Sequence, residues 1–301
     1  MSGTQTLAGR FEAHRRHLQA VAYRMLGSLA EAEDAVQEAW LRLSRTDAAG
    51  QADGIGNLGG WLTTVTGRIC LDMLRARAAR REEPMDDRPA AFVPDPLLRP
   101  LPHDDPEQEA LHADAVGLAL LVVLETLEPA ERLAFVLHDM FAVPFDDIAL
   151  VVERSPAATR QLASRARRRV RAATPAADPD LGRQKKVLEA FLAASREGDF
   201  DALLALLHPE VVLRADAGSV VRGAAATKLV HGARAVAEQA AMFSPFAHAA
   251  RPALVNGAIG AVTVIEGRPL AVMGVTVADG RITGMYILAD PRRLARLHLP
   301  A

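Results

Sequence analysis

The segment 145–171 carries a run of arginines on what the spacing of its apolar residues predicts to be a helix-turn-helix. Residues 146–152 have the pattern of a short amphipathic helix, and Glu153-Arg154 forms a tight connection. Ser155 is a natural N-cap for the next helix, and Pro156 suits its first position. Because guanidinium groups hydrogen-bond phosphates and base edges, the chemistry predicted here is non-covalent recognition of DNA.

The second helix of this pair has an apolar stripe and an opposite polar face. The stripe repeats at helical spacing and consists of Ala158, Leu162, Ala166 and Val170. In this motif the N-terminal residues of the second helix face base edges in the major groove, and later basic residues lie near phosphates. The predicted DNA contacts are Ala157, Thr159, Arg160, Gln161, Ser164, Arg165 and Arg168. The alternative is a solvated helix end whose arginines complement the helix dipole.

A second basic surface is predicted at the end of a helix that runs from Trp61 to about Arg81. The side chains expected to point inward are Trp61, Val65, Ile69 and Leu74. The run that closes the helix contains Arg75, Arg77, Arg80 and Arg81. Alone, such a run is typical of a solvated helix end. It bears on function because it adds a second basic surface to that of the helix-turn-helix. Cys70, within the helix, is expected to be a small buried residue, with redox sensing as the alternative.

The helix predicted from Glu31 to Leu43 is acidic where the other two are basic. Ser28 and Glu31 form a capping box at its start. A buried face is predicted at Val36, Ala39, Trp40 and Leu43. The exposed side carries Asp34, Gln37, Glu38 and Leu41. An acidic face with an exposed leucine fits docking to a basic partner helix, and ordinary solvated surface is the alternative.

Composition limits the class of protein. The chain has 301 residues, half of them apolar, and a formal net charge of -2. This apolar content excludes wholesale disorder, and the single cysteine excludes an intrachain disulfide framework and a Cys-rich zinc site. Because no signal-like or membrane-length apolar run occurs, we expect a cytoplasmic protein, and no residue cluster indicates a metal or a cofactor. A near-neutral net charge on its face argues against nucleic-acid binding, but this charge is a sum over separate basic and acidic segments and does not exclude a basic DNA-binding surface.

Two proline-rich breaks divide the chain. Prolines recur from Pro84 to Pro106 and forbid a continuous helix there, and a shorter break begins at Thr174. The predicted organisation is therefore an all-α domain, a linker, a second all-α domain and an α+β domain. Their boundaries are 1–83, 84–106, 107–174 and 175–301. Fully extended, the linker would reach about 70 Å at ~3.3 Å per residue.

The α+β assignment rests on a change of hydrophobic period. Residues 183–207 have helical spacing, and short β-type runs follow. These runs cover 211–213, 251–255, 259–265, 270–277 and 282–288. Asn256-Gly257, Glu266-Gly267 and Asp279-Gly280 lie between the later runs, and each supplies a glycine that accepts the positive φ of a tight hairpin. An antiparallel meander that follows helices is therefore expected.

Together the three helical segments resemble the extracytoplasmic-function (ECF) subfamily of sigma-70 RNA polymerase sigma factors. Residues 32–42 are similar to the region that grips the clamp helices of core RNA polymerase, and residues 61–75 to the helix that melts and reads the −10 element. Residues 145–168 resemble the helix-turn-helix that reads the −35 element. The resemblance implies core-polymerase contacts at Asp34, Gln37, Glu38 and Leu41. It implies −10 contacts at Trp61, Arg68, Asp72, Arg75 and Arg77, and −35 contacts at the seven helix residues named above.

The last piece resembles a SnoaL-like, NTF2-fold cone, and such a fusion marks the SigJ-like (ECF41-type) group. Residues 92–97 look like the Trp-Leu-Pro-Glu-Pro linker motif of that group, with Phe92 in place of Trp. Residues 216–220 and 290–294 stand where an Asp-Gly-Gly-Gly-Lys loop and an Asn-Pro-Asp-Lys-Leu motif are usual. The resemblance implies an interdomain regulatory contact through Phe92, Pro94, Asp95, Pro96, Asp216, Gly218, Asp290 and Pro291.

The predicted function is promoter-specific transcription initiation with core RNA polymerase, modulated in cis by the C-terminal domain and not requiring a separate anti-sigma factor. A second hypothesis is a helix-turn-helix regulator that senses a small molecule in the cone and never binds polymerase. A third is catalysis in the cone, for which Asp216, His231 and His248 are candidate acid–base groups by residue type. No paired motif supports the third hypothesis, so an enzyme is not expected.

Overall fold

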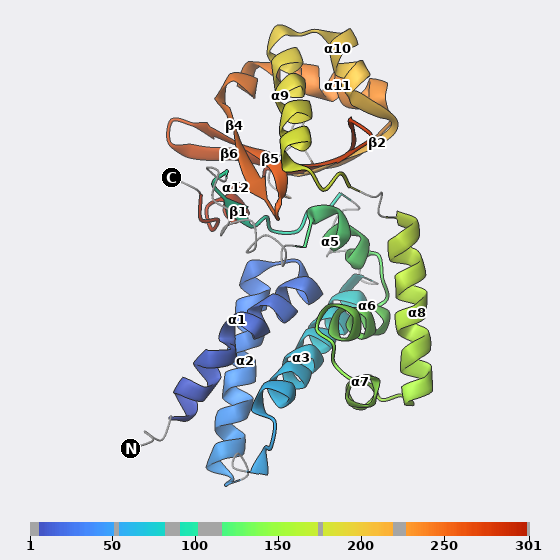
Figure 1. The fold of residues 1–301 in the computed structure, drawn as a ribbon. Coiled ribbons are helices and arrows are strands. Elements are labelled where there is room, and N and C mark those ends of the chain that lie inside the picture. The colour runs from blue at the N-terminus through green and yellow to red at the C-terminus, as the bar shows by residue number, and fades with distance from the viewer. Residues whose placement is uncertain are drawn as a thin grey trace. The chain divides into compact units, whose positions relative to one another are not determined.

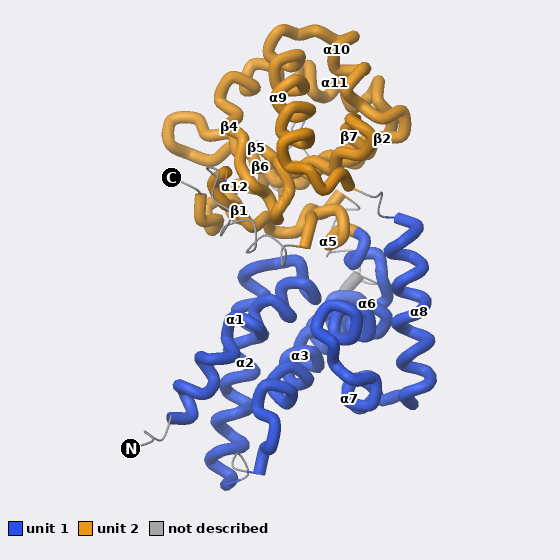
Figure 2. Tube along the Cα trace, viewed as in Figure 1, with its two compact units in different colours: residues 1–87, 123–173 blue, residues 88–122, 174–301 orange. Residues whose placement is uncertain are grey.

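The computed structural model describes residues 6–50, 54–81, 91–101, 116–173, 177–218 and 227–299 of the chain (Figure 1). By contact, residues 1–87 and 123–173 form unit 1, and residues 88–122 and 174–301 form unit 2 (Figure 2). Most of the two predicted helical domains thus belongs to one unit, while the described part of the predicted linker belongs with the C-terminal domain. None of the helices in the described ranges is long and apolar enough to span a membrane.

Unit 1 begins with three helices that share an apolar core. They are α1 (Leu7–Leu26), α2 (Leu29–Ala48) and α3 (Leu58–Arg81). Gly27 between the first two adopts φ 68°, which a residue with a Cβ rarely adopts. Ser28 caps α2, because its Oγ accepts the Glu31 N–H at 3.5 Å. The Glu31 carboxylate also accepts a hydrogen bond from Arg77 Nη2 at 2.6 Å, so this residue connects α2 to α3 as well as starting α2.

The buried face of α3 is wider than its periodicity predicts. Ile69 and Leu74 are buried as expected, whereas Trp61 and Val65 are only half-buried. The buried set also includes Leu62, Thr63, Thr66, Gly67, Cys70 and Leu71. α3 contacts α1 and α2 and, in addition, α6 (Pro129–Phe135) and α7 (Phe145–Val152). A helix packed against two sets of partners buries more than one stripe of side chains.

The helix-turn-helix occupies the second half of unit 1. After α6 come a π-helical turn, η2 (Val136–Met140), then α7 and α8 (Pro156–Ala173). α7 ends at Glu153, which has φ 58°, and Ser155 Oγ accepts the Ala158 N–H at 3.2 Å. The predicted turn, N-cap and proline position are confirmed. α5 (Leu118–Glu125) precedes this motif and contributes its first residues to unit 2 and its last to unit 1.

Unit 2 is an α+β domain whose described residues form a seven-stranded sheet. The strands are β1 (Leu98–Arg99), β2 (Leu207–Asp216), β3 (Lys228–His231), β4 (Ala250–Val255), β5 (Ala258–Ile265), β6 (Arg268–Ala278) and β7 (Arg281–Leu288). Their order is β1-β4-β5-β6-β7-β2-β3, with β2 and β7 parallel and the other neighbours antiparallel. The helices are α9 (Leu181–Glu197), α10 (Phe200–Leu206), α11 (Ala233–Met242) and α12 (Pro291–Leu294), with the 3-10 turn η4 (Ser244–Ala249).

Three tight turns connect the meander β4–β7, as predicted. Their φ angles are 52° and 77° at Asn256-Gly257, 50° and 75° at Glu266-Gly267, and 49° and 71° at Asp279-Gly280. Two consecutive residues in the left-handed region are the mark of a type I′ turn, whose twist suits a hairpin. The sequence did not predict β1 or β3, which are two and four residues long. The helix predicted over 183–207 is divided by Gly198, which caps α9 at φ 70°.

The two faces of the sheet have different partners. α9 lies across one face (Figure 1), where Phe191 joins Leu213 and Met285 in the main hydrophobic core. On the opposite face Gly274 leaves space for Leu118 of α5, since a Cβ at Gly274 would lie 2.7 Å from Leu118 Cδ1. The sheet thus packs on its own helices on one side and receives the segment that precedes the helix-turn-helix on the other.

Candidate DNA, polymerase and linker interfaces

α8 presents most of the residues predicted to contact DNA. Those exposed are Ala157, Arg160, Gln161, Ser164, Arg165 and Arg168. The prediction for Thr159 is wrong, because Thr159 is fully buried and its Oγ1 donates to the Ser155 carbonyl at 3.0 Å. The buried residues of α8 are Thr159, Leu162, Ala163 and Ala166, because α8 packs on α6 through a face rotated from the predicted stripe. Thr159 therefore supports the first turn of α8 and cannot reach a base edge.

Acidic side chains hold several arginines of α8 against the rest of unit 1. The buried Glu131 carboxylate accepts from Arg165 Nε at 2.6 Å and from Arg169 Nη1 at 3.1 Å. Arg167 Nε donates to Asp139 Oδ1 at 2.5 Å. Arg165 and Arg169 stay about half exposed, so each guanidinium docks α8 on α6 and offers only its remaining donors to a phosphate.

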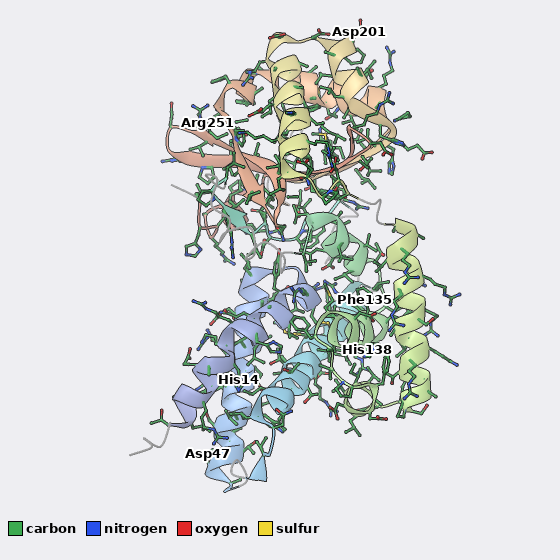
Figure 3. The ribbon with its side chains drawn as sticks, in the orientation of Figure 1. His14, Asp47, Phe135, His138, Asp201 and Arg251 are labelled. Carbon is green, nitrogen blue, oxygen red and sulfur yellow. The ribbon has the colours of Figure 1, made fainter. Side chains whose placement is uncertain are left out.

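An aromatic side chain positions Arg160. The His138 ring, labelled in Figure 3, stacks on the Phe145 ring with centroids 3.7 Å apart. His138 Nδ1 lies 3.0 Å from the Val143 carbonyl oxygen, which fixes the ring plane. The Arg160 guanidinium carbon is 5.6 Å from the Phe145 centroid, within range of cation–π attraction. The sequence pattern does not indicate His138 and Phe145 as supports, because Phe145 lies against Arg160 across the turn of the motif and His138 acts through Phe145.

The acidic face predicted on α2 is exposed. Asp34 and Gln37 are exposed, and Leu41 keeps 47% of its surface accessible. Glu38 is half-buried because Arg42 and Arg45 lie 3.1 Å and 3.8 Å from its carboxylate. The resulting surface combines two acidic groups with an apolar side chain, which is the composition expected of a docking face for a basic helix.

α3 exposes a polar edge at three of the predicted −10 contacts. Arg68, Asp72 and Arg75 are exposed, and Trp61 is half-buried. Arg68 Nη2 lies 2.7 Å from the carboxylate of Glu153, the residue in the turn between α7 and α8. Both side chains are at least half exposed, so the pair is weak and the Arg68 guanidinium can exchange this partner for a phosphate.

The prediction that Arg77 contacts DNA is wrong. Its side chain is 11% exposed, with Nη2 2.6 Å from Glu31 and Nη1 3.9 Å from Glu125. Glu125 also accepts from Arg132, whose side chain is 2% exposed, at 2.9 Å. Two arginines and two glutamates thus join α2, α3, α5 and α6, and their alternating charges offset part of the desolvation cost. The Arg77 guanidinium therefore forms ion pairs inside unit 1.

Arg293 joins the three motifs predicted to make an interdomain contact. Its Nε donates to Asp95 Oδ1 at 2.7 Å, and its Nη1 donates to Asp216 Oδ2 at 2.7 Å. Its Nη2 donates to the Val93 carbonyl at 2.5 Å, and its Cζ lies 4.9 Å from the Phe92 ring centroid. We call these five residues the Arg293 clamp. It binds the linker to the end of β2 and to α12, all within unit 2.

The backbone around the Arg293 clamp is fixed by the same motifs. Asp290 Oδ1 accepts the Arg292 N–H at 2.8 Å and caps α12, with Pro291 at the first helical position. Asp216 Oδ1 accepts the Gly218 N–H at 3.1 Å, and a Cβ at Gly218 would overlap the Asp290 carboxylate. Pro94 and Pro96 are buried beside them. Arg293 is not among the predicted contact residues, although its basic type at the lysine position of the 290–294 motif is a signal for it.

Comparison with known proteins agrees with this layout. Two family models match the chain: Sigma-70 region 2 over residues 10–80 and Sigma-70, region 4 over residues 117–170. The chain is 40% identical over 295 residues to the ECF RNA polymerase sigma factor SigJ of Mycobacterium tuberculosis, covering 93% of this chain and 91% of that protein. The chain belongs to the ECF sigma factor family.

Other relatives extend over the same length. The probable ECF RNA polymerase sigma factor SigI of Mycobacterium tuberculosis is 35% identical over 302 residues, covering 98% of this sigma factor and 97% of SigI. The crystal structure of Mycobacterium tuberculosis SigJ matches with a TM-score of 0.71 at 36% identity, covering 96% of this chain and 98% of that one. Because these matches include the C-terminal domain, the predicted fusion of sigma domains to a SnoaL-like cone is confirmed.

The three candidate acid–base residues in the cone of this sigma factor differ in burial. Asp216 is buried, and both of its carboxylate oxygens accept hydrogen bonds within or beside the Arg293 clamp. His231 and His248 are exposed side chains on β3 and η4. In the described part of the chain no three His, Cys, Asp or Glu residues are grouped to hold a metal ion. Asp216 therefore has a structural use that accounts for its position.

Cys70 lies in the core of the sigma factor's first three helices. It is fully buried, and burial raises the pKa of its thiol to about 12, although the nearby Arg132 guanidinium acts in the opposite direction. The thiolate is the reactive form of cysteine, so a raised pKa makes the thiol inert at neutral pH. Because the folded pKa is above the unfolded one, this thiol also favours unfolding as the pH rises beyond about 9.

We expect folded protein at pH 8 to react with iodoacetamide at least about 100-fold more slowly than protein unfolded in urea, because the thiolate is suppressed and enclosed. Mass spectrometry of the Cys70 peptide over a time course measures both rates. A Cys70→Ala variant, in which the labelled peptide is absent, is the control. Fast labelling of the folded protein would instead support redox sensing by this residue.

Proposed function

We propose that this sigma factor binds core RNA polymerase in the cytoplasm and directs it to two-element promoters, with its SnoaL-like domain modulating it in cis through the linker. The observation that carries the proposal is that one chain, aligned with ECF sigma factors over nearly its whole length, exposes the acidic face of α2 and the polar face of α8. The first face supports polymerase binding and the second supports −35 reading. The exposed edge of α3 around Arg68 and Arg75 supports binding at the −10 element.

We expect purified full-length protein plus core polymerase of its own organism to give run-off transcripts on promoters selected from a random library. Leu41→Arg should lose most of this activity, because it places a cation in the face proposed to receive a basic helix. Core polymerase alone is the negative control, and an immobilised core pull-down measures binding. Sequence-specific DNA binding without any retention on core would favour the polymerase-independent regulator instead.

Arg160 is the proposed reader of a base edge in the −35 element. Arg160→Ala should cost about 1–3 kcal/mol in binding to the selected −35 sequence and should relax the preference at one base pair. Arg168→Ala is the matched variant, since it removes an exposed arginine from a position suited to phosphates. It should weaken matched and scrambled sites equally. Competition binding of the holoenzyme to both sites measures the two ratios, and equal losses for Arg160→Ala would make it a phosphate contact.

The Arg293 clamp is the proposed means of regulation in cis. It occupies linker residues 92–95 that would otherwise extend between the two DNA-binding regions. Removing the whole C-terminal domain would be a poor test of this idea, because it would also uncover the buried side chains of Val93 and Leu118, which pack against that domain. A point substitution in the clamp removes the contacts of a single side chain and leaves the C-terminal domain in place.

Arg293→Met should increase hydrogen exchange at residues 92–95 by at least about tenfold, because it leaves the buried Asp95 and Asp216 carboxylates without their cation. Transcription from the selected promoters should fall as well, because a longer free tether lowers the effective concentration of region 4 at its element. Arg292→Met, on the exposed side of α12, is the matched control and should change neither measurement. Unchanged exchange in Arg293→Met would show that the clamp does not hold the linker.

A further inference from the structure

Asn256 bonds two points of the chain that are 19 residues apart, Leu97 in the linker and Val116 just before α5. Its side-chain Oδ1 accepts the Leu97 N–H at 2.9 Å, and its Nδ2 donates to the Val116 carbonyl at 3.0 Å. Its backbone N–H donates to the Leu97 carbonyl at 2.8 Å. The residue is 2% exposed, so these hydrogen bonds are made away from water, where leaving either partner unpaired is costly.

The turn that carries Asn256 does not need this side chain for its own geometry. Asn256 is the first residue of the β4–β5 hairpin turn, with φ 52°, and Glu266 and Asp279 occupy the equivalent positions of the next two hairpins. A glutamate and an aspartate there show that the turns accept other side chains. The buried amide of Asn256 is therefore explained by the linker contacts rather than by the hairpin.

Neighbouring contacts hold the chain at the same two points. On the N-terminal side, β1 pairs with β4 through Leu98 opposite Val255. On the C-terminal side, Leu118 fills the space beside Gly274. We call the two side-chain hydrogen bonds of Asn256 the Asn256 staple. It fixes both ends of the 18 residues from 98 to 115 on one side chain, although this stretch would span about 60 Å if it were extended.

We propose that Asn256 is a positioning residue that sets the length of the tether between the two DNA-binding regions, and hence the spacer length between the −10 and −35 elements. This inference rests on the proposed function. With the staple closed, region 4, which is matched from residue 117, follows directly after the stapled Val116. The tether between α3 and the C-terminal domain is then counted from Arg81 to Phe92, the first clamp residue.

Spacer length is a sensitive measure of tether length because duplex DNA is stiff over this distance. Each added base pair moves the two elements apart by about 3.4 Å and turns one against the other by roughly a tenth of a helical turn. One extended residue spans nearly the same distance, about 3.3 Å. A tether longer by 18 residues would therefore accept displacements of several base pairs, whereas a stapled tether would not.

The test compares holoenzymes on a series of promoters whose spacer changes by single base pairs. N256G is the main variant, because glycine accepts the left-handed φ of this turn and removes both staple bonds. N256D keeps an acceptor for the Leu97 N–H but presents oxygen to the Val116 carbonyl, so it is a second way to open the staple. E266G is the matched control, since it makes the same change in the next hairpin at an exposed residue.

For the wild type and E266G, run-off transcription should fall at least about tenfold when the spacer is two base pairs from its optimum. For N256G the same displacement should cost less than about threefold, with lower activity at the optimum, because a longer tether is less selective and gives a lower effective concentration. Faster hydrogen exchange at residues 97–99 and 116–118 should accompany this change and report that the staple is open.

Identical spacer profiles for the wild type and N256G, with exchange showing an open staple, would overturn the role of Asn256. If N256G shows a lower thermal transition and poor yield, N256D decides the question by the same criterion. Absence of promoter-dependent transcripts with the wild type would overturn the proposed function itself, and the inference with it.

Discussion

Burial of two like charges near each other is the constraint that organises unit 2. Asp95 from the linker and Asp216 from the end of β2 are both nearly inaccessible to water, where two carboxylates repel strongly. The Arg293 guanidinium bonds to both, and charge-assisted hydrogen bonds offset much of the cost of removing these groups from water. The path of the linker, the end of β2 and the start of α12 consequently depend on one another.

The same rule determines which arginines of unit 1 face outward. Arg77 and Arg132 form ion pairs with glutamates inside unit 1, and Arg165 forms an ion pair with the buried Glu131. A count of basic residues, like the net charge of -2, cannot separate such structural arginines from the exposed Arg160. Charge composition therefore says little about DNA binding in this chain until the internal partners of each arginine are known.

Local signals made much of the fold predictable, and contacts between distant segments made the rest unpredictable. The three hairpin turns and the N-cap at Ser155 depend on a few adjacent residues, and the structure confirms them. The motif geometry predicts a DNA contact for Thr159, and the resemblance implies one for Arg77, but neither signal reveals that these side chains are enclosed by contacts with other helices. Val93, one of the partners of Arg293, lies 200 residues away, so the part of Arg293 in the linker contact could not be predicted from its sequence neighbours.

The backbone of linker residues 93–97 is suited to burial against a folded domain. Prolines alternate with other residues over 93–97. A buried proline leaves no backbone N–H without a hydrogen bond, because it has none. It also loses little backbone conformational entropy when the segment becomes ordered. The remaining donors at the two ends are satisfied by side chains, since the Val93 N–H bonds to Asp216 and the Leu97 N–H bonds to Asn256. A segment without regular secondary structure is thereby buried at low cost. The described residues 91–101 lie against the C-terminal domain, with β1 at the edge of its sheet, whereas the sequence alone predicts an extended tether of about 70 Å.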